Sequence, residues 1–174
     1  MGAKFSKPKM HRIKAILRER YGDRRMNAIF LLKSKNTVAF LYDDNTLRQG
    51  LEKMRVHGYT AMPVITREGK YAGCISEGDF LWHILETEDG TMKGQELHLI
   101  RDIVRNGWNP AVSINVEMEA LLERAMNQNF VPVIDDRSSF IGIITRKDII
   151  QYFTSRQFEL LTAEKQKSEG AAGA

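Results

Sequence analysis

The chain has 174 residues, of which 43% are hydrophobic and 28% are charged, and its formal net charge is +4. These proportions are ordinary for a folded globular protein and exclude a chain that is mostly disordered. No apolar run approaches the roughly 20 residues that a spanning helix needs, and the N-terminus lacks the apolar core of a signal peptide. We therefore expect no contact with the membrane and a cytoplasmic location.

The basic charge gathers at the N-terminus. Residues 1–25 hold nine lysines and arginines against two acidic residues, so they carry +7 and leave −3 for the rest of the chain. Apolar side chains at helical spacing over 12–21 predict a short amphipathic helix within a basic arm, 1–26. Such an arm can bind a nucleic-acid backbone electrostatically, which is the alternative function. A solvated or docking helix is the interpretation that we favour.

Residues 27–86 predict a first structural unit. The β-branched and aromatic run 38–42 predicts a strand. Thr46 and Gln49 have the spacing of a capping box, which starts a helix, and Gly58 has the place of a residue that ends one. Two more strands and a second helix are predicted at 62–65, 71–76 and 79–85.

An internal repeat organises the remainder. Three marker residues, Pro63, Gly73 and Asp79, return 69 residues later as Pro132, Gly142 and Asp148. The polar stretch 87–97 predicts a linker, 98–154 a second unit, and 155–174 a tail that is partly disordered. The second unit is predicted to have a short helix at 100–104, strands at 111–114, 131–134 and 140–144, and helices at 117–127 and 146–153.

Each copy is too small to bury a sizeable core alone, so we expect the two copies to pack against each other. The order strand–helix–strand–strand–helix, with Pro-Val in the second strand and Gly-x-x-(Ser/Thr)-x-x-Asp from the third, resembles the CBS domain. Two copies over about 27–154 resemble a CBS pair, or Bateman module, an α/β (α+β) fold with pseudo-two-fold symmetry. The resemblance implies a non-catalytic homodimer that binds an adenine nucleotide between the copies as a regulatory ligand, not a cofactor. Occupancy would then pass to a regulated protein by conformational change.

The repeated hydroxyl and carboxylate suit a ribose. Ser76 and Asp79, like Thr145 and Asp148, stand three residues apart where a strand meets a helix. The carboxylate can accept bonds from the 2′- and 3′-hydroxyls, and a helix N-terminus favours a phosphate. The simpler interpretation is that each aspartate only caps its helix, but its recurrence in the same context favours a site.

The resemblance implies that each cleft mixes the two copies. Arg146 and Lys147 would serve the phosphate in the main cleft, where arginine can form paired bonds and lysine acts as a point charge. The ligand-binding residues expected in the main cleft are Thr37, Val38, Ala39, Tyr59, Thr60, Ala61, Pro63, Thr145, Arg146, Lys147 and Asp148.

The second cleft is expected to be weaker. Glu77 stands where Arg146 stands in the other copy, and a carboxylate there repels phosphate. The segment before the Pro-Val strand is also three residues shorter than in the first copy. We expect this cleft to be empty or to hold a neutral, adenosine-like group. Its candidate residues are Ser76, Asp79, Ala111, Val112, Phe130 and Val131.

Several short segments narrow the resemblance. Val38-Ala39, Gly58-Tyr59-Thr60-Ala61 and Thr145-Arg146-Lys147 are similar to segments of small CBS-pair proteins that bind cyclic di-AMP, which places that ligand level with AMP or ATP. An enzyme is not expected, because the sequence has no phosphate-loop motif and its four histidines lack metal-ligand spacing. The single cysteine, Cys74, excludes an intrachain disulfide and is predicted to be buried in a strand.

Overall fold

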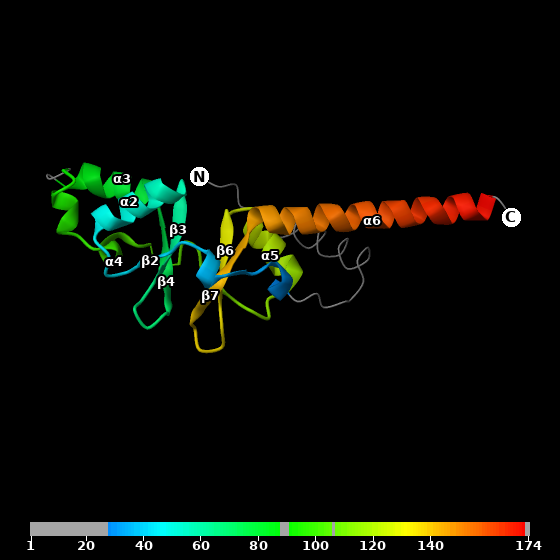
Figure 1. The fold of residues 1–174 in the computed structure, drawn as a ribbon, viewed down its shortest axis with the longest axis horizontal. Helices are drawn as coiled ribbons and strands as arrows, with labels where there is room; N and C mark the ends of the chain where they lie inside the picture. The colour runs from blue at the N-terminus through cyan, green and yellow to red at the C-terminus, as the bar shows by residue number, and fades with distance from the viewer. Residues whose placement is uncertain (1–27, 88–90, 106, 173–174) are drawn as a thin grey trace.

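The structure, a computed structural model, describes residues 28–87, 91–105 and 107–172. Two units lie side by side along its long axis, and a long helix extends from the second unit (Figure 1). The expected basic arm, 1–26, lies outside the described residues, so its nucleic-acid role stays a prediction. None of the described helices is long and apolar enough to cross a membrane.

The first copy folds around a three-stranded sheet. Strand β2 is parallel to β3, and β3 is antiparallel to β4. The elements in chain order are β2 (Leu41–Tyr42), α2 (Leu47–His57), β3 (Ala61–Ile65), β4 (Tyr71–Ser76) and α3 (Glu77–Glu86).

Helix α2 begins and ends as its sequence predicts. The Thr46 hydroxyl accepts a hydrogen bond from the Gln49 amide at 3.2 Å, and the Gln49 side chain accepts one from the Thr46 amide at 3.0 Å. Gly58 ends the helix in the left-handed region, at φ 63°, where glycine has no steric cost.

The expected strand 38–42 is shorter than predicted. Only Leu41–Tyr42 pairs with β3. The 3-10 helix η2 (Lys35–Thr37), whose N-cap is Ser34, ends just before the expected strand, and residues 38–40 connect the two.

The second copy has the same order of elements. Its strands form a four-stranded sheet in the order β1-β7-β6-β5, which includes β1 (Lys33–Ser34) from before the first copy. The 3-10 helix η1 (Ala28–Leu31) precedes β1. The other elements are η3 (Gly94–Glu96), α4 (Ile100–Ile103), β5 (Val112–Ser113), α5 (Met118–Ala125), β6 (Phe130–Ile134), β7 (Phe140–Thr145) and α6 (Arg146–Ala172).

Two flanking segments contain helical structure that the sequence analysis did not predict. The polar stretch 87–97, expected as a plain linker, contains η3, which contacts α2 and buries Gln95. The tail 155–174, expected to be partly disordered, continues α6 as one helix to Ala172. Helix formers such as Leu, Glu, Lys, Gln and Ala fill this stretch and no proline interrupts it, so its polar composition does not prevent a helix.

Each copy has its own hydrophobic core, rather than the shared core expected from the size of the copies. The two cores are nevertheless completed by exchange. Ile100, which precedes the first strand of the second copy, is fully buried in the first core, and Ala28, which precedes the first strand of the first copy, is buried in the second. The Ile100 amide also donates to the Asn45 carbonyl at 2.9 Å. The segment before the first strand of each copy therefore packs on the other copy.

The repeated glycine marks where these segments cross. Ser34 pairs with Gly142 in the β1–β7 ladder, and Arg105 forms an isolated bridge with Cys74, next to Gly73. A Cβ on Gly142 would lie 2.0 Å from the Lys33 carbonyl oxygen, and a Cβ on Gly73 would lie 2.8 Å from Val104 Cγ2. Both glycines have a positive φ, 153° for Gly73 and 156° for Gly142. A side chain at either position would push the crossing segment away.

We predict that Gly142→Ala lowers the free energy of unfolding by at least about 2 kcal/mol, because overpacking against a backbone atom cannot relax easily. The matched control is Gly78→Ala, where the added Cβ would meet no atom closer than 3.6 Å and alanine favours the helix. Urea unfolding measures both variants. Equal stability of Gly142→Ala and the wild type would contradict the close crossing.

Candidate functional site

The junction of β7 and α6 brings the predicted hydroxyl and carboxylate together. The Thr145 hydroxyl donates to Asp148 Oδ2, and the Asp148 amide donates back to the same hydroxyl oxygen at 3.2 Å. The carboxylate thus lies in the first turn of α6, directly after the strand. We call this arrangement of Thr145 and Asp148 the second-copy corner.

A lysine from before the first copy contacts this corner. Lys33 Nζ lies 3.0 Å from Asp148 Oδ2, with 22% of the aspartate side chain exposed. Burial raises the pKa of Asp148, but the hydrogen bonds from the Thr145 hydroxyl and the Lys33 ammonium outweigh it and hold the pKa below its ordinary value. The sequence did not predict Lys33, because only the register of β1 against β7 places it there.

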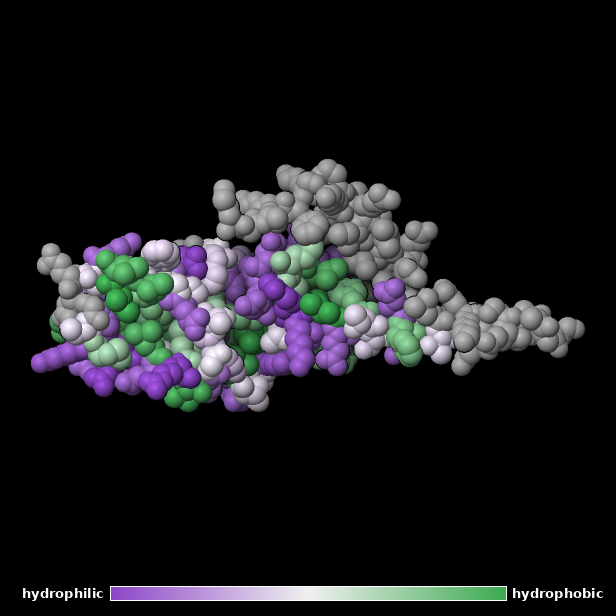
Figure 2. Space-filling model, turned by 90° about the horizontal axis from the view of Figure 1, so that it is seen from above, coloured by the Kyte–Doolittle hydropathy of each residue, from purple (hydrophilic) through white to green (hydrophobic). Residues whose placement is uncertain are grey.

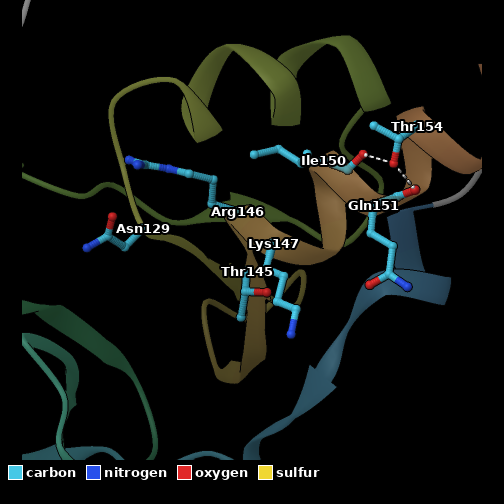
Figure 3. Close-up of a pocket in the computed structure, with 7 residues that line it drawn as sticks. All are labelled: Asn129, Thr145, Arg146, Lys147, Ile150, Gln151 and Thr154. Carbon is cyan, nitrogen blue, oxygen red and sulfur yellow. Dashed lines mark hydrogen bonds between the residues drawn. The ribbon is translucent and has the colours of Figure 1, made fainter.

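A cavity of about 660 Å³ adjoins the corner (Figure 3). Three predicted residues line it, and Ile150, Gln151 and Thr154 complete its wall along α6. Sequence reasoning missed these three, although each follows Arg146 or Lys147 at the i+4 or i+7 spacing that shares a helix face. The full lining is Asn129, Thr145, Arg146, Lys147, Ile150, Gln151 and Thr154.

The loop before β6 holds Arg146 in place. Its Nε donates to the Gln128 carbonyl at 3.0 Å, and its amide donates to the Asn129 carbonyl at 2.9 Å. The side chain points toward Asn129 (Figure 3). These bonds position one cation at the cavity wall, and Lys147 adds a second from the exposed surface of the same helix turn.

The first-copy residues expected in the main cleft do not line this cavity. Thr37 ends η2, an element that contacts β7 of the second copy, while Ala39 packs against the first core. Tyr59 is exposed and stacks on His57, with 5.4 Å between ring centroids.

The residues that follow Tyr59 pair within the first copy. The Thr60 carbonyl accepts from the Glu77 amide at 3.1 Å, while Ala61 and Pro63 of β3 pair with Ser76 and Cys74 of β4. Their role in a mixed cleft stays a prediction.

The corresponding first-copy corner is formed by Ser76 and Asp79. The Ser76 amide and hydroxyl both donate to Asp79 Oδ2, at 2.7 and 2.8 Å. Arg105 Nε lies 2.7 Å from Asp79 Oδ1, and only 8% of the aspartate side chain is exposed. Of the other candidates, Val112, Phe130 and Val131 are buried and Ala111 is half-buried.

The remaining chemistry of the described residues is limited. Cys74 is buried as predicted, its thiol donates to the Met62 carbonyl at 3.1 Å, and burial raises its pKa to about 12. Within the ranges that the structure describes, no three potential metal ligands gather in one place.

Comparison with protein families decides what the repeated unit is. The model of the CBS domain matches residues 34–86 and 100–155, one match in each copy. The chain belongs to the CBS domain family. Its two CBS domains coincide with the two units of the fold, and the mixed α/β architecture agrees with the expected Bateman module.

Curated relatives carry the same domain in larger proteins. Inosine-5′-monophosphate dehydrogenase of Methanocaldococcus jannaschii is 29% identical over 110 residues, which are 62% of this chain and 20% of that protein. The A-adding tRNA nucleotidyltransferase of Aquifex aeolicus is 29% identical over 140 residues, 80% of this chain and 15% of that protein. The chain thus spans a fifth or less of the length of these relatives.

Solved structures share the tandem fold. A CbpB protein in complex with c-di-AMP has a TM-score of 0.73 at 22% identity and covers 90% of this chain and 99% of its own. CbpB of Listeria monocytogenes, also in complex with c-di-AMP, has a TM-score of 0.68 at 24% identity, over 78% of this chain and 99% of its own. CBSX2 in complex with AMP has a TM-score of 0.60 at 16% identity, over 74% of this chain and 96% of its own.

We predict that Lys33→Gln raises the pKa of Asp148, because the ammonium that favours the carboxylate is gone. A lowered native pKa stabilises the fold above the unfolded value of about 3.9, and this contribution is lost as the pH falls through the native pKa. The wild type should therefore exceed the variant in stability at pH 7, and the difference should shrink below about pH 4.

Urea unfolding at several pH values and an NMR titration of the carboxyl measure these effects. Lys93→Gln, at an exposed lysine, is the control. A stability difference that does not change with pH would contradict the ion pair.

Proposed function

We propose that this chain is a non-catalytic regulatory module that binds an adenine nucleotide at the second-copy corner. One observation carries the proposal: Thr145, whose hydroxyl donates to Asp148 Oδ2, lines a cavity together with the cations Arg146 and Lys147. A volume of about 660 Å³ is within the usual range for small-molecule sites, about 300–1,000 Å³.

The charges at this corner match the parts of a nucleotide. Asp148 is an acceptor for ribose hydroxyls, and its described contacts with Thr145 and Lys33 both reach Oδ2, so Oδ1 is the oxygen that would face the ribose. Arg146 uses Nε for the Gln128 carbonyl, and its terminal nitrogens would bind a phosphate. The N-terminus of the 27-residue helix α6 adds a favourable field for that negative charge.

Cyclic di-AMP is the ligand that we propose first, and AMP or ATP is the alternative. The two neighbouring cations, Arg146 and Lys147, attract a ligand with two separate phosphates more strongly than a site with one cation would. The CbpB structures with c-di-AMP match more of this chain, at higher TM-scores, than the CBSX2 structure with AMP. Both comparisons support an adenine nucleotide.

Ligand binding would be transmitted through the packing of the two copies. Because Lys33 belongs to β1, which leads into the first copy, a ribose bound at Asp148 Oδ1 would lie next to a contact between the copies and would alter it. A regulated protein that binds one packing arrangement better than the other would sense this shift in population.

We predict that Arg146→Ala lowers nucleotide affinity by about 1.5–3 kcal/mol, the range for a hydrogen bond to a charged group. Asp148→Ala should weaken adenosine as well as cyclic di-AMP, because it removes the ribose acceptor. Isothermal titration calorimetry against cyclic di-AMP, ATP, AMP and adenosine measures both effects. Arg101→Ala, which removes an exposed arginine on α4, is the control. Unchanged affinity in both site variants would overturn the assignment.

We also propose a homodimer that forms through the exposed face of α3. Leu81, Trp82 and Leu85 are large apolar side chains on this helix, and all three are more than half exposed. Figure 2 shows hydrophobic side chains gathered on the face of the first copy that α3 covers in Figure 1. Apolar patches of this kind mark association surfaces.

We predict that Leu85→Ser shifts the chain from dimer to monomer, because a hydroxyl replaces apolar area at the proposed contact. Sedimentation equilibrium at several concentrations measures the change. Phe158→Ser, at an exposed phenylalanine on α6, should leave the dimer intact. A wild type that sediments as a monomer would contradict the proposal.

A further inference from the structure

The carboxylate of the first-copy corner already has a cation and donors on both oxygens. Asp79 Oδ2 accepts from the Ser76 amide and hydroxyl, and Asp79 Oδ1 pairs with Arg105 Nε at 2.7 Å. Arg105 Nη2 also lies 3.4 Å from the Ser76 hydroxyl. The guanidinium therefore contacts both groups that a ribose would need.

Arg105 is fixed by more than its ion pair. Its backbone forms an antiparallel bridge with Cys74 of β4. Its guanidinium carbon lies 3.8 Å from the ring centroid of Trp108, a distance at which a cation–π interaction is favourable. The backbone of Arg105 is thus held by β4, and its side chain by Asp79 and the ring of Trp108.

Asn109 is hydrogen-bonded to both copies near the start of β6. Its side-chain amide donates to the Phe130 carbonyl at 3.1 Å, and the Tyr71 hydroxyl donates to the Asn109 carbonyl at 2.6 Å. A base that is read by the edge of β6 would have to displace this amide. Arg105 thus makes the contacts that a ribose would make with Ser76 and Asp79, and Asn109 makes the contact that a base would make with the Phe130 carbonyl.

The second-copy corner differs at the equivalent position. Lys33 pairs with Ile143, and Arg105 pairs with Cys74. Ile143 and Cys74 are 69 residues apart, the spacing of the repeat, so Lys33 and Arg105, 72 residues apart, hold equivalent places. Lysine offers a point charge where arginine offers a planar fork. Asp148 also keeps 22% of its side chain exposed, against 8% for Asp79. A ligand can therefore displace Lys33 more easily than Arg105.

We infer that Arg105 is an internal occupant that closes the first-copy corner to nucleosides, so that the chain binds its nucleotide at the second-copy corner alone. This inference rests on the proposed function. Glu77 adds a separate barrier, because its carboxylate in the first turn of α3 repels a phosphate. A neutral nucleoside therefore isolates the effect of Arg105 from that of Glu77.

The test uses Arg105→Ala in the full chain and adenosine as the probe. The chain has two tryptophans, so a Trp82→Phe background leaves Trp108, beside the corner, as the reporter. By calorimetry we expect about one adenosine per chain in the background protein and about two in Arg105→Ala. The second site is expected because both corners have the same hydroxyl and carboxylate. Only the second binding event should change the Trp108 fluorescence.

Two further variants locate the gained site. Adding Asp79→Ala to Arg105→Ala should abolish the gained site and its fluorescence change, whereas adding Asp148→Ala should abolish only the original site. Lys93→Ala, at an exposed lysine outside both corners, should leave the stoichiometry at one. If Arg105→Ala fails to fold by circular dichroism, Arg105→Gln provides the same test, because it removes the charge and keeps polar contacts.

The possible results separate the two proposals. A second site in the background protein, or no gain in a folded Arg105 variant, overturns the inference. If the background protein binds no adenosine at the second-copy corner, the proposed function is overturned. A site gained in Arg105→Ala that depends on Asp79 would still support the role of Arg105.

Discussion

The close crossing of two chain segments over Gly73 and Gly142 is the constraint on which the rest of the structure depends. Each crossing brings the residues that precede one copy onto the sheet of the other, with no space for a side chain between them. The β1–β7 ladder, the exchange of Ile100 and Ala28 between the cores, and the cation at each corner all follow from this geometry. The two copies therefore fold as one interlocked unit, although each has its own core.

Local patterns in the sequence predict most of the elements, because their causes are local. The capping box at Thr46, the left-handed glycine at 58 and the buried Pro-Val strands each depend on a few neighbouring residues. The two-residue strand β1 carries no such pattern, and Lys33 and Arg105 meet their carboxylates only through pairing across the copies. The polar composition of the tail also gave no sign that helix formers continue α6 to Ala172.

The same motif has acquired two different environments. Both corners join a hydroxyl to a carboxylate three residues later, so the motif alone describes them as equal sites. The residues outside the motif distinguish them. Asp148 pairs with Lys33, whereas Asp79 pairs with Arg105, which also stacks on Trp108. Glu77 and Arg146 stand at matching positions, so the first turns of α3 and α6 carry opposite charges. The two corners therefore differ in electrostatics at residues that the repeated motif does not include.

The length of α6 has a mechanical consequence. The helix begins at the residue after Thr145, carries Asp148 in its first turn, and runs for 27 residues away from both sheets. At 1.5 Å per residue it is about 40 Å long, so a tilt of about 5° at the corner would move its far end by about 3.5 Å. A rearrangement at the second-copy corner that is too small to disturb the cores would thus be magnified at Ala172, the far end of the helix, so α6 has the geometry of a lever anchored at that corner.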